Sequence, residues 1–194
     1  MLKPFYQGKL DVFCAMYAVL NGLRLTHNVR TLKARDLLNE TLLKLASKPA
    51  AFRAVLNQET DYVALVDSML DDMGKKFPLQ VIRPFKAADL PDVGRFWDVC
   101  WDWMSPNGAR ASNRAIILRF SRFRQPDSQQ AVARHWTTVD AMDANIMHLF
   151  DSSHDADAIQ NMGRDSIVTF ARDLDEKHLF LIHTDTTRFL RLPF

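Results

Sequence analysis

The sequence predicts an α+β fold in which a helical N-terminal half precedes a C-terminal half made of antiparallel strands. Apolar residues recur at helical spacing through much of the first hundred residues. Later residues form short segments rich in branched and aromatic side chains, separated by turn-forming residues. Helices first and strands afterwards is the pattern of an α+β protein. The 194 residues suffice for a sizeable core and contain no long linker, so we expect one domain over residues 1–194.

Five helices are expected, each from its apolar spacing and from a residue that favours a helix start. They are a helix capped by Asp11 that contains Cys14, Tyr17, Ala18, Leu20 and Leu25, a helix capped by Thr31 that runs to Leu45, a helix after Ser47-Lys48-Pro49 that ends near Leu56, a helix capped by Thr60 that runs from Asp61 to Met73, and a helix over 93–104. Gly74 is expected to end the fourth helix in the left-handed conformation. In the fifth helix, the spacing of Trp97 and Trp101 predicts an aromatic stripe that faces the core.

Seven strands are expected in the remainder of the chain. They cover residues 79–82, 115–123, 135–140, 146–150, 166–170, 179–184 and 188–192. The turn-prone sequence Asp143-Ala144-Asn145 joins the third strand to the fourth. Residues 119–124 mix basic and aromatic side chains, as platforms for single-stranded nucleic acid do. We interpret them instead as part of an edge strand that its arginines keep soluble.

Composition and charge indicate which kinds of partner the protein binds and in which compartment of the cell it lies. The 25 basic and 23 acidic residues give a net charge of +2, which is too small to predict a nucleic-acid partner. No apolar run approaches the length of a membrane span, and residues 1–5 lack the apolar core of a signal peptide, so we expect a cytoplasmic protein. Cys14 and Cys100 do not make a disulfide framework, and no Cys-x-x-Cys or His-x-x-x-His spacing predicts a metal site. No cofactor is expected.

Four residues form the candidate catalytic site. Cys14 lies in the first turn of a predicted helix, where the positive end of the helix dipole favours the thiolate. His135 opens a predicted strand and Asp151 follows the next strand, and a hairpin register centred on Asp143 would make the two face each other. Gln7 and the backbone N–H of Cys14 could both donate hydrogen bonds to an oxyanion. The alternatives are a buried Cys14 that acts as a small apolar residue and an edge histidine beside a solvated aspartate.

The pattern of Gln7, the helix-borne Cys14, His135-Trp136 and Asp151 resembles the papain-like cysteine peptidases. Within that family it looks most like the bacterial branch that cleaves bacteriocin leader peptides, and related stand-alone domains. The resemblance covers residues 6–21 and 135–152. It implies a papain-like fold with the nucleophile helix packed on an antiparallel sheet, and it makes Cys14 the nucleophile, His135 the base and then the acid, Asp151 the orienting group, and Gln7 an oxyanion donor.

The chain differs from the usual family pattern at two positions. Ala15 stands where a glycine usually follows the cysteine, and Gln7 lies about one residue farther from Cys14 than usual. From the four site residues and the resemblance, we expect a cysteine hydrolase that cleaves a peptide, isopeptide or side-chain amide bond of a protein or peptide substrate through a thioester. The alternatives are acyl transfer of the transglutaminase or deamidase type at the same site, and a catalytically inactive papain-like binding module. The sequence predicts no oligomeric state.

Overall fold

The computed structural model describes residues 2–7, 12–106, 111–125, 131–153 and 159–193, which form a seven-stranded sheet with helices on both faces. The helices are α1 Cys14–His27, α2 Thr31–Ala46, α3 Pro49–Leu56, α4 Tyr62–Gly74 and α5 Val93–Met104. The strands are β1 Gln80–Ile82, β2 Arg114–Arg122, β3 Ala133–Met142, β4 Ile146–Leu149, β5 Asn161–Gly163, β6 Ile167–Val168 and β7 Phe180–Arg191. The predicted α+β class is confirmed. None of the described helices is long and apolar enough to cross a lipid bilayer.

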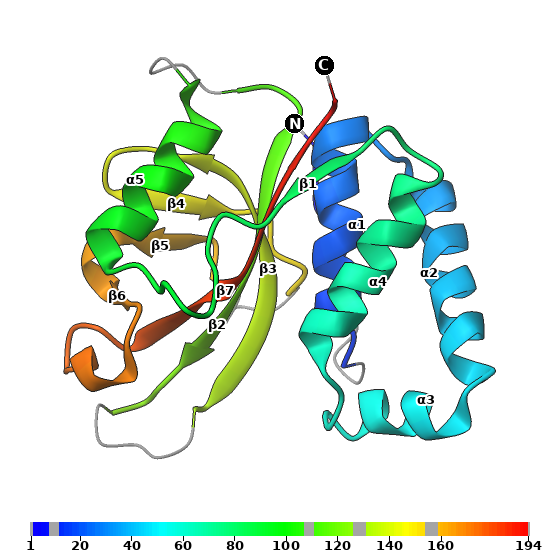
Figure 1. Cartoon of the computed structure of the whole chain (residues 1–194), viewed down its shortest axis with the longest axis horizontal. Helices are drawn as coiled ribbons and strands as arrows, with labels where there is room; N and C mark the ends of the chain where they lie inside the picture. Colours follow the sequence, from blue (N-terminus) through cyan, green and yellow to red (C-terminus); the bar gives the residue numbers. More distant parts are fainter. Residues whose placement is uncertain (1, 8–11, 107–110, 126–130, 154–158, 194) are drawn as a thin grey trace.

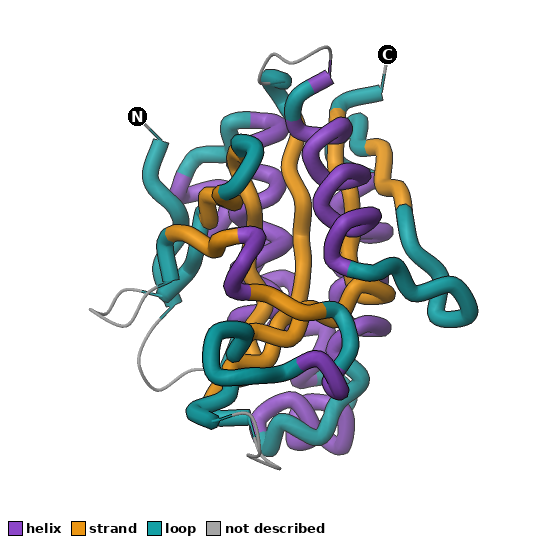
Figure 2. The backbone as a smooth tube through the Cα atoms, turned by 90° about the vertical axis from the view of Figure 1, so that its left-hand side faces the viewer, coloured by secondary structure: helices purple, strands orange, loops and turns teal. Residues whose placement is uncertain are grey.

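The strands follow the order β1-β7-β2-β3-β4-β5, and all neighbours along this path are antiparallel. β6 pairs with β7 in parallel, away from this path. Helices α1 to α4 lie on one face of the sheet and α5 lies on the other (Figure 1). Seen from the side of α5, the long central strands run in front of the purple helices of the opposite layer (Figure 2). The order of helices before strands therefore gives a helical layer packed against a sheet.

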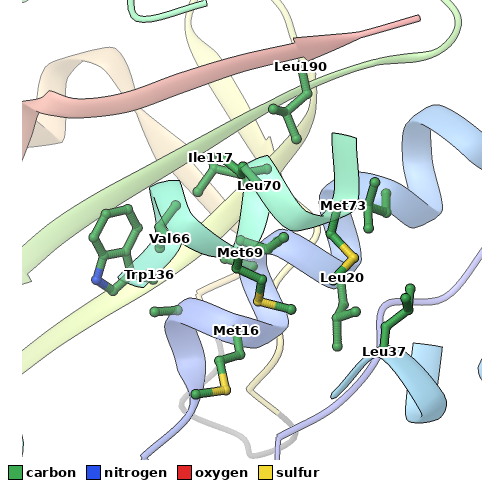
Figure 3. Close-up of a cluster of buried hydrophobic side chains, with 14 of the residues drawn as sticks. Met16, Leu20, Leu37, Val66, Met69, Leu70, Met73, Ile117, Trp136 and Leu190 are labelled. Atoms are coloured by element: carbon green, nitrogen blue, oxygen red, sulfur yellow. The ribbon is translucent and has the colours of Figure 1, made fainter. Parts of the chain in front are cut away.

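Two apolar clusters fill the space on the two faces of the sheet. Figure 3 shows the larger cluster, in which side chains of α1, α2 and α4 surround Ile117 of β2, Trp136 of β3 and Leu190 of β7. On the opposite face, α5 packs Phe96, Trp97 and other side chains against the alternate residues of the same strands. Because successive residues of a strand point to opposite faces, each central strand contributes to both clusters.

The start and end of several helices differ from the predicted ones by one residue. The N-cap residues are Arg30, Lys48 and Asp61, not Thr31, Ser47 and Thr60. Only Asp61 of these three uses its side chain, which accepts hydrogen bonds from the N–H groups of Val63 and Ala64. Gly74 is the last helical residue of α4 and is followed by Lys75 with φ −74°, so the predicted left-handed glycine end is wrong. The predicted cap Asp11 lies outside the described residues.

The strand predictions need three corrections. β2 is a central strand, hydrogen-bonded to β7 and to β3, so the prediction of an edge strand is wrong. β7 is one long strand and not two, because its register with β2 shifts between Ile117 and Arg119 and accommodates the polar residues 184–187 as a bulge. β5 was not expected, because its three residues carry no alternating pattern. The predicted stripe of α5 holds for the fully buried Trp97, while Trp101 is half-buried.

Candidate active site

Cys14 is the first residue of α1, and its side chain is half-buried. The N-cap residue Phe13 provides no side-chain acceptor for the N–H groups of the first turn. α1 starts here because the residues after Cys14 supply a continuous apolar face that packs under β2 and β3. Cys14 lines a cavity of about 380 Å³ together with Gln7 and His135. The other cysteine, Cys100, is a free thiol buried in the core beneath α5.

His135 and Asp151 form a hydrogen-bonded pair. The distance between His135 Nε2 and Asp151 Oδ2 is 2.8 Å. The side chains are largely shielded from solvent, with exposed fractions of 17% for His135 and 6% for Asp151. The second carboxylate oxygen of Asp151 accepts the backbone N–H of Ser153 at 2.7 Å. Both oxygens of Asp151 are therefore engaged, which fixes the carboxylate and, through it, the orientation of the imidazole ring.

Cys14 lines the same cavity as His135 and lies close enough to act on the pKa of the imidazole. Burial lowers the pKa of His135, but the hydrogen bonds to Asp151 and Cys14 and the charges of both partners outweigh it and raise this pKa to about 10. Burial also raises the pKa of Asp151, and the bond to His135 more than compensates, so this pKa lies below its ordinary value. The arrangement favours a charged imidazolium between two acidic partners.

The predicted hairpin register between β3 and β4 is wrong, although the two side chains meet. Val139 pairs with Leu149 and Met142 pairs with Met147, with an irregularity between Val139 and Ala141, so no register centred on Asp143 exists. β4 ends at Leu149 and the ladder continues only through the N–H of Phe150, which donates to the carbonyl of Thr138 at 2.6 Å. Asp151 therefore reaches His135 from a loop just beyond the strand.

Gln7 lies in the same cavity as Cys14, on the side of the Asp151 loop. Its backbone N–H donates to the carbonyl of Ser152, the residue after Asp151, at 2.8 Å. This bond attaches the N-terminal segment to the loop that carries the carboxylate. All four predicted site residues, Gln7, Cys14, His135 and Asp151, are thus gathered at one place, where the start of α1 meets β3.

Asn21 and Thr138 hold these parts together, and sequence reasoning missed both. Asn21, which is buried on α1, accepts the N–H of Phe5 at 2.7 Å and donates to the carbonyls of Phe5 and Phe150. The hydroxyl of Thr138 on β3 donates to the carbonyl of Ala18 on α1 at 2.8 Å. A polar residue on the buried face of a helix is the signal that could have marked Asn21.

A second cavity of about 1000 Å³ continues the first one on the far side of His135. His135, Arg134 and Gln58 line both cavities, so the imidazole stands between two hollows that together form a cleft. Gln58 lies in the turn after α3 and adopts a left-handed φ of 59°, which a non-glycine residue rarely does. The two hollows adjoin at the imidazole and Cys14 lines the smaller one, so the cleft can hold an extended chain with its reacting carbonyl at Cys14.

Among the described residues, no group of three or more His, Cys, Asp or Glu side chains is placed to hold a metal ion. No protein-family model matches the sequence, and a search of curated proteins finds no match. A function must therefore be argued from the geometry and the chemistry of the residues themselves.

Proposed function

We propose that this protein is a cysteine hydrolase of papain-like fold that cleaves a peptide, isopeptide or side-chain amide bond. The observation that carries the proposal is that Asp151 bonds His135 at 2.8 Å and that Cys14 lines the same cavity as this imidazole. In the proposed reaction the imidazole of His135 takes the proton of the Cys14 thiol, which leaves the sulfur as the nucleophile. The same three groups in this order form a nucleophile, a base and an orienting carboxylate.

The reaction follows from these positions. The sulfur of Cys14 attacks the carbonyl carbon, and the carbonyl electron pair moves to the oxygen. The imidazolium of His135 then gives its proton to the leaving nitrogen as the carbon–nitrogen bond breaks, which leaves a thioester on Cys14. His135, now neutral, takes a proton from water as the water oxygen attacks the thioester carbon. The carbon–sulfur bond then breaks, which releases the acid and leaves the Cys14 sulfur beside the imidazolium of His135, whose proton can return to the sulfur. Asp151 stays ionised throughout and stabilises the imidazolium.

Two groups are suited to stabilise the oxyanion. Gln7, whose side chain carries an amide donor, lines the Cys14 cavity, and the backbone N–H of Cys14 stands at the start of α1, where no side chain of the N-cap residue competes for it. Ala15, which replaces the usual glycine of the family, is almost fully buried and belongs to the core cluster. The methyl group of Ala15 therefore packs in the core and does not obstruct access to the Cys14 sulfur. This difference from the family pattern is thus compatible with an active enzyme.

The decisive experiment measures alkylation of each cysteine by iodoacetamide at pH 7, followed by mass spectrometry of the digested protein. We expect Cys14 to react about tenfold faster than a free cysteine thiol, and His135→Ala to abolish this advantage. Cys100→Ala is the matched control and should leave the reaction unchanged, because Cys100 is fully buried. Equal reaction of Cys14 in the wild type and in His135→Ala would refute the proposed site.

Hydrolysis is distinguished from acyl transfer by the fate of the thioester. Incubation of the protein with a casein digest and a fluorescent primary amine tests both outcomes together. Release of new peptide N-termini without amine incorporation supports proteolysis, whereas incorporation that depends on Cys14 supports transfer. A protein that reacts with neither substrate and shows no rapid alkylation would be an inactive binding module.

A further inference from the structure

Two arginines stand in the wall of the cavity that contains Cys14. Arg119 of β2 is half-buried and Arg134 of β3 is exposed. Arg119 pairs directly with Trp136 in the sheet, and Arg134 precedes Trp136 by two positions on the same face. Such diagonal neighbours have their Cα atoms roughly 7–8 Å apart, which is within reach for two long side chains that converge on one anion.

Neither arginine has a carboxylate partner within the described part of the chain. Elsewhere this protein does pair its buried arginine, since Arg188 bonds Asp67 at 2.6 Å. The acidic side chain in the cavity wall, Asp61, is occupied by the N–H groups at the start of α4. A half-buried guanidinium without a counter-charge is costly, so its place in a cavity wall indicates an anionic ligand.

The charges of both arginines act on the same neighbourhood. Burial and the Cys14 charge raise the pKa of Tyr62 in this cavity, and the charge of Arg119 partly opposes them. Burial first, and then the charges of Arg119 and Arg134, lower the pKa of His183, while Asp185 raises it. His183 pairs with Arg119 across the sheet and bonds Ser121 at 2.8 Å. Both guanidinium groups therefore act on His183, and both line the cavity that contains Cys14.

We propose that Arg119 and Arg134 form a carboxylate-binding subsite next to Cys14, so that the enzyme acts on peptides that carry a carboxylate beside the scissile bond. The carboxylate belongs either to an aspartate or glutamate side chain or to the free C-terminus of the peptide. Two guanidinium groups from neighbouring strands suit the planar, bidentate geometry of this group. This inference rests on the proposed function, because it takes Cys14 as the reacting atom.

The test compares two alkylating reagents that differ in charge. In each reaction the Cys14 sulfur forms a bond to the methylene carbon of the reagent, and the carbon–iodine bond breaks to release iodide. Iodoacetate carries a carboxylate and iodoacetamide carries a neutral amide of similar size. The ratio of the two rates at Cys14 therefore measures the attraction of the site for a carboxylate. It is determined for the wild type, Arg119→Gln, Arg134→Gln and Arg134→Lys, with Arg35→Gln as control.

We expect each glutamine variant to lower the ratio of the iodoacetate to the iodoacetamide rate about threefold to tenfold, because it removes one positive charge from the cavity wall beside the carboxylate of the reagent. Arg134→Lys keeps the charge but loses the planar fork, so it should lower the ratio less than Arg134→Gln does. Arg35 is exposed on α2 and lines neither cavity, so Arg35→Gln should leave it unchanged. Arg134 is also exposed, so its variants fold even if Arg119→Gln does not. An unchanged ratio in Arg134→Gln would overturn the subsite.

The outcomes separate the subsite from the proposed function. Rapid alkylation of Cys14 by iodoacetamide without any effect of the arginine variants overturns the subsite and leaves the hydrolase standing. Slow alkylation of Cys14 by both reagents overturns the subsite and the proposed hydrolase together. Matched peptides then identify the source of the carboxylate. Cleavage that needs Asp or Glu in place of Asn or Gln supports a side-chain carboxylate, and cleavage that is lost on C-terminal amidation supports a terminal one.

Discussion

His135 and Asp151 meet at 2.8 Å although the hairpin between them does not pair them. His135 stands near the beginning of β3, and Asp151 follows the last ladder bond of β4, between Phe150 and Thr138. The contact therefore depends on the loop after β4, whose position is held by the bonds of Asn21 to Phe150 and of Gln7 to Ser152. The bonds of Asn21 and of the Gln7 backbone thus help to place the carboxylate that raises the pKa of His135.

The pKa of His135 should report this contact directly. In Asp151→Asn the charge of the carboxylate is gone, so the pKa of His135 should fall from its value of about 10. Two-dimensional NMR of histidine side chains over pH 5–11 measures it. Asp143→Asn is the control, because Asp143 lies beside His148 and not beside His135. A wild-type His135 that titrates at its ordinary pKa of 6.5 would contradict the charged pair.

The stability of the protein should depend on pH through the same pair. The folded-state pKa of His135 lies above its unfolded value, so its contribution to folding is complete below about pH 6.5 and is lost as the pH rises toward 10. The free-energy difference between the wild type and His135→Gln, measured by urea unfolding, should therefore shrink from pH 6 to pH 10. Asp151, whose pKa is lowered, contributes in the opposite sense and loses its contribution as the pH falls through the acid range.

Local patterns predicted most of the secondary structure, because α5 and the strands of the sheet carry regular apolar spacing. The five helices were found with ends correct to one or two residues, since helix periodicity is a local property. The place of β2 in the sheet was missed because it depends on which strands pair. The arginines on β2 suggested an edge, but Arg119 and Arg122 lie at the end of the strand that borders the cleft.

Only part of the candidate site could be predicted from the sequence. The residue types and chain order of Cys14 and His135 suggested the chemistry of a cysteine hydrolase. In the fold, these two residues line the same cavity. The register that led to Asp151 was wrong, because a strand irregularity between Val139 and Ala141 leaves no trace in the sequence. Long-range bonds such as that of Asn21 to Phe150 join residues 129 positions apart and have no local signature.

Asn21→Leu should destabilise the protein and slow alkylation of Cys14. Asn21 is buried and bonds both backbone groups of Phe5 and the carbonyl of Phe150, so a leucine leaves these groups unpaired. The cost is about 1–3 kcal/mol. Urea unfolding measures the stability, and the iodoacetamide rate reports the site. Asn39→Leu is the control at an exposed position of α2 and should change the stability by no more than about 0.5 kcal/mol.

Thr138→Val tests the bond that joins the helix of Cys14 to the strand of His135. The hydroxyl of Thr138 donates to the carbonyl of Ala18 in the core, so its loss should cost about 1 kcal/mol and reduce the reactivity of Cys14. Thr184→Val is a matched control on β7. The hydroxyl of Thr184 is buried without a partner in the described part of the chain, so its removal should be neutral or stabilising. Equal effects of the two variants would contradict the coupling.

Gly22→Ala should push α1 slightly away from the sheet and lower the stability of the protein. A Cβ at Gly22 would lie 2.6 Å from Leu190 Cδ1 and 3.4 Å from Ile117 Cδ1. Both neighbours are fully buried, so little space is left for them to move into. Overpacking of this kind costs about 1–3 kcal/mol, and it exceeds the gain of up to about 1 kcal/mol from a better helix former.

Gly74→Ala separates the effect of packing from that of helix propensity. Nothing lies within 4 Å of a Cβ at Gly74, the last residue of α4, so this variant should be neutral or gain a few tenths of a kcal/mol. Gly22→Ala should also slow the reaction of Cys14 with iodoacetamide, because a displaced α1 carries the sulfur away from His135. If Gly22→Ala lowers the stability but leaves the alkylation rate unchanged, the close approach of α1 to β7 and β2 serves the core alone and not the position of the nucleophile.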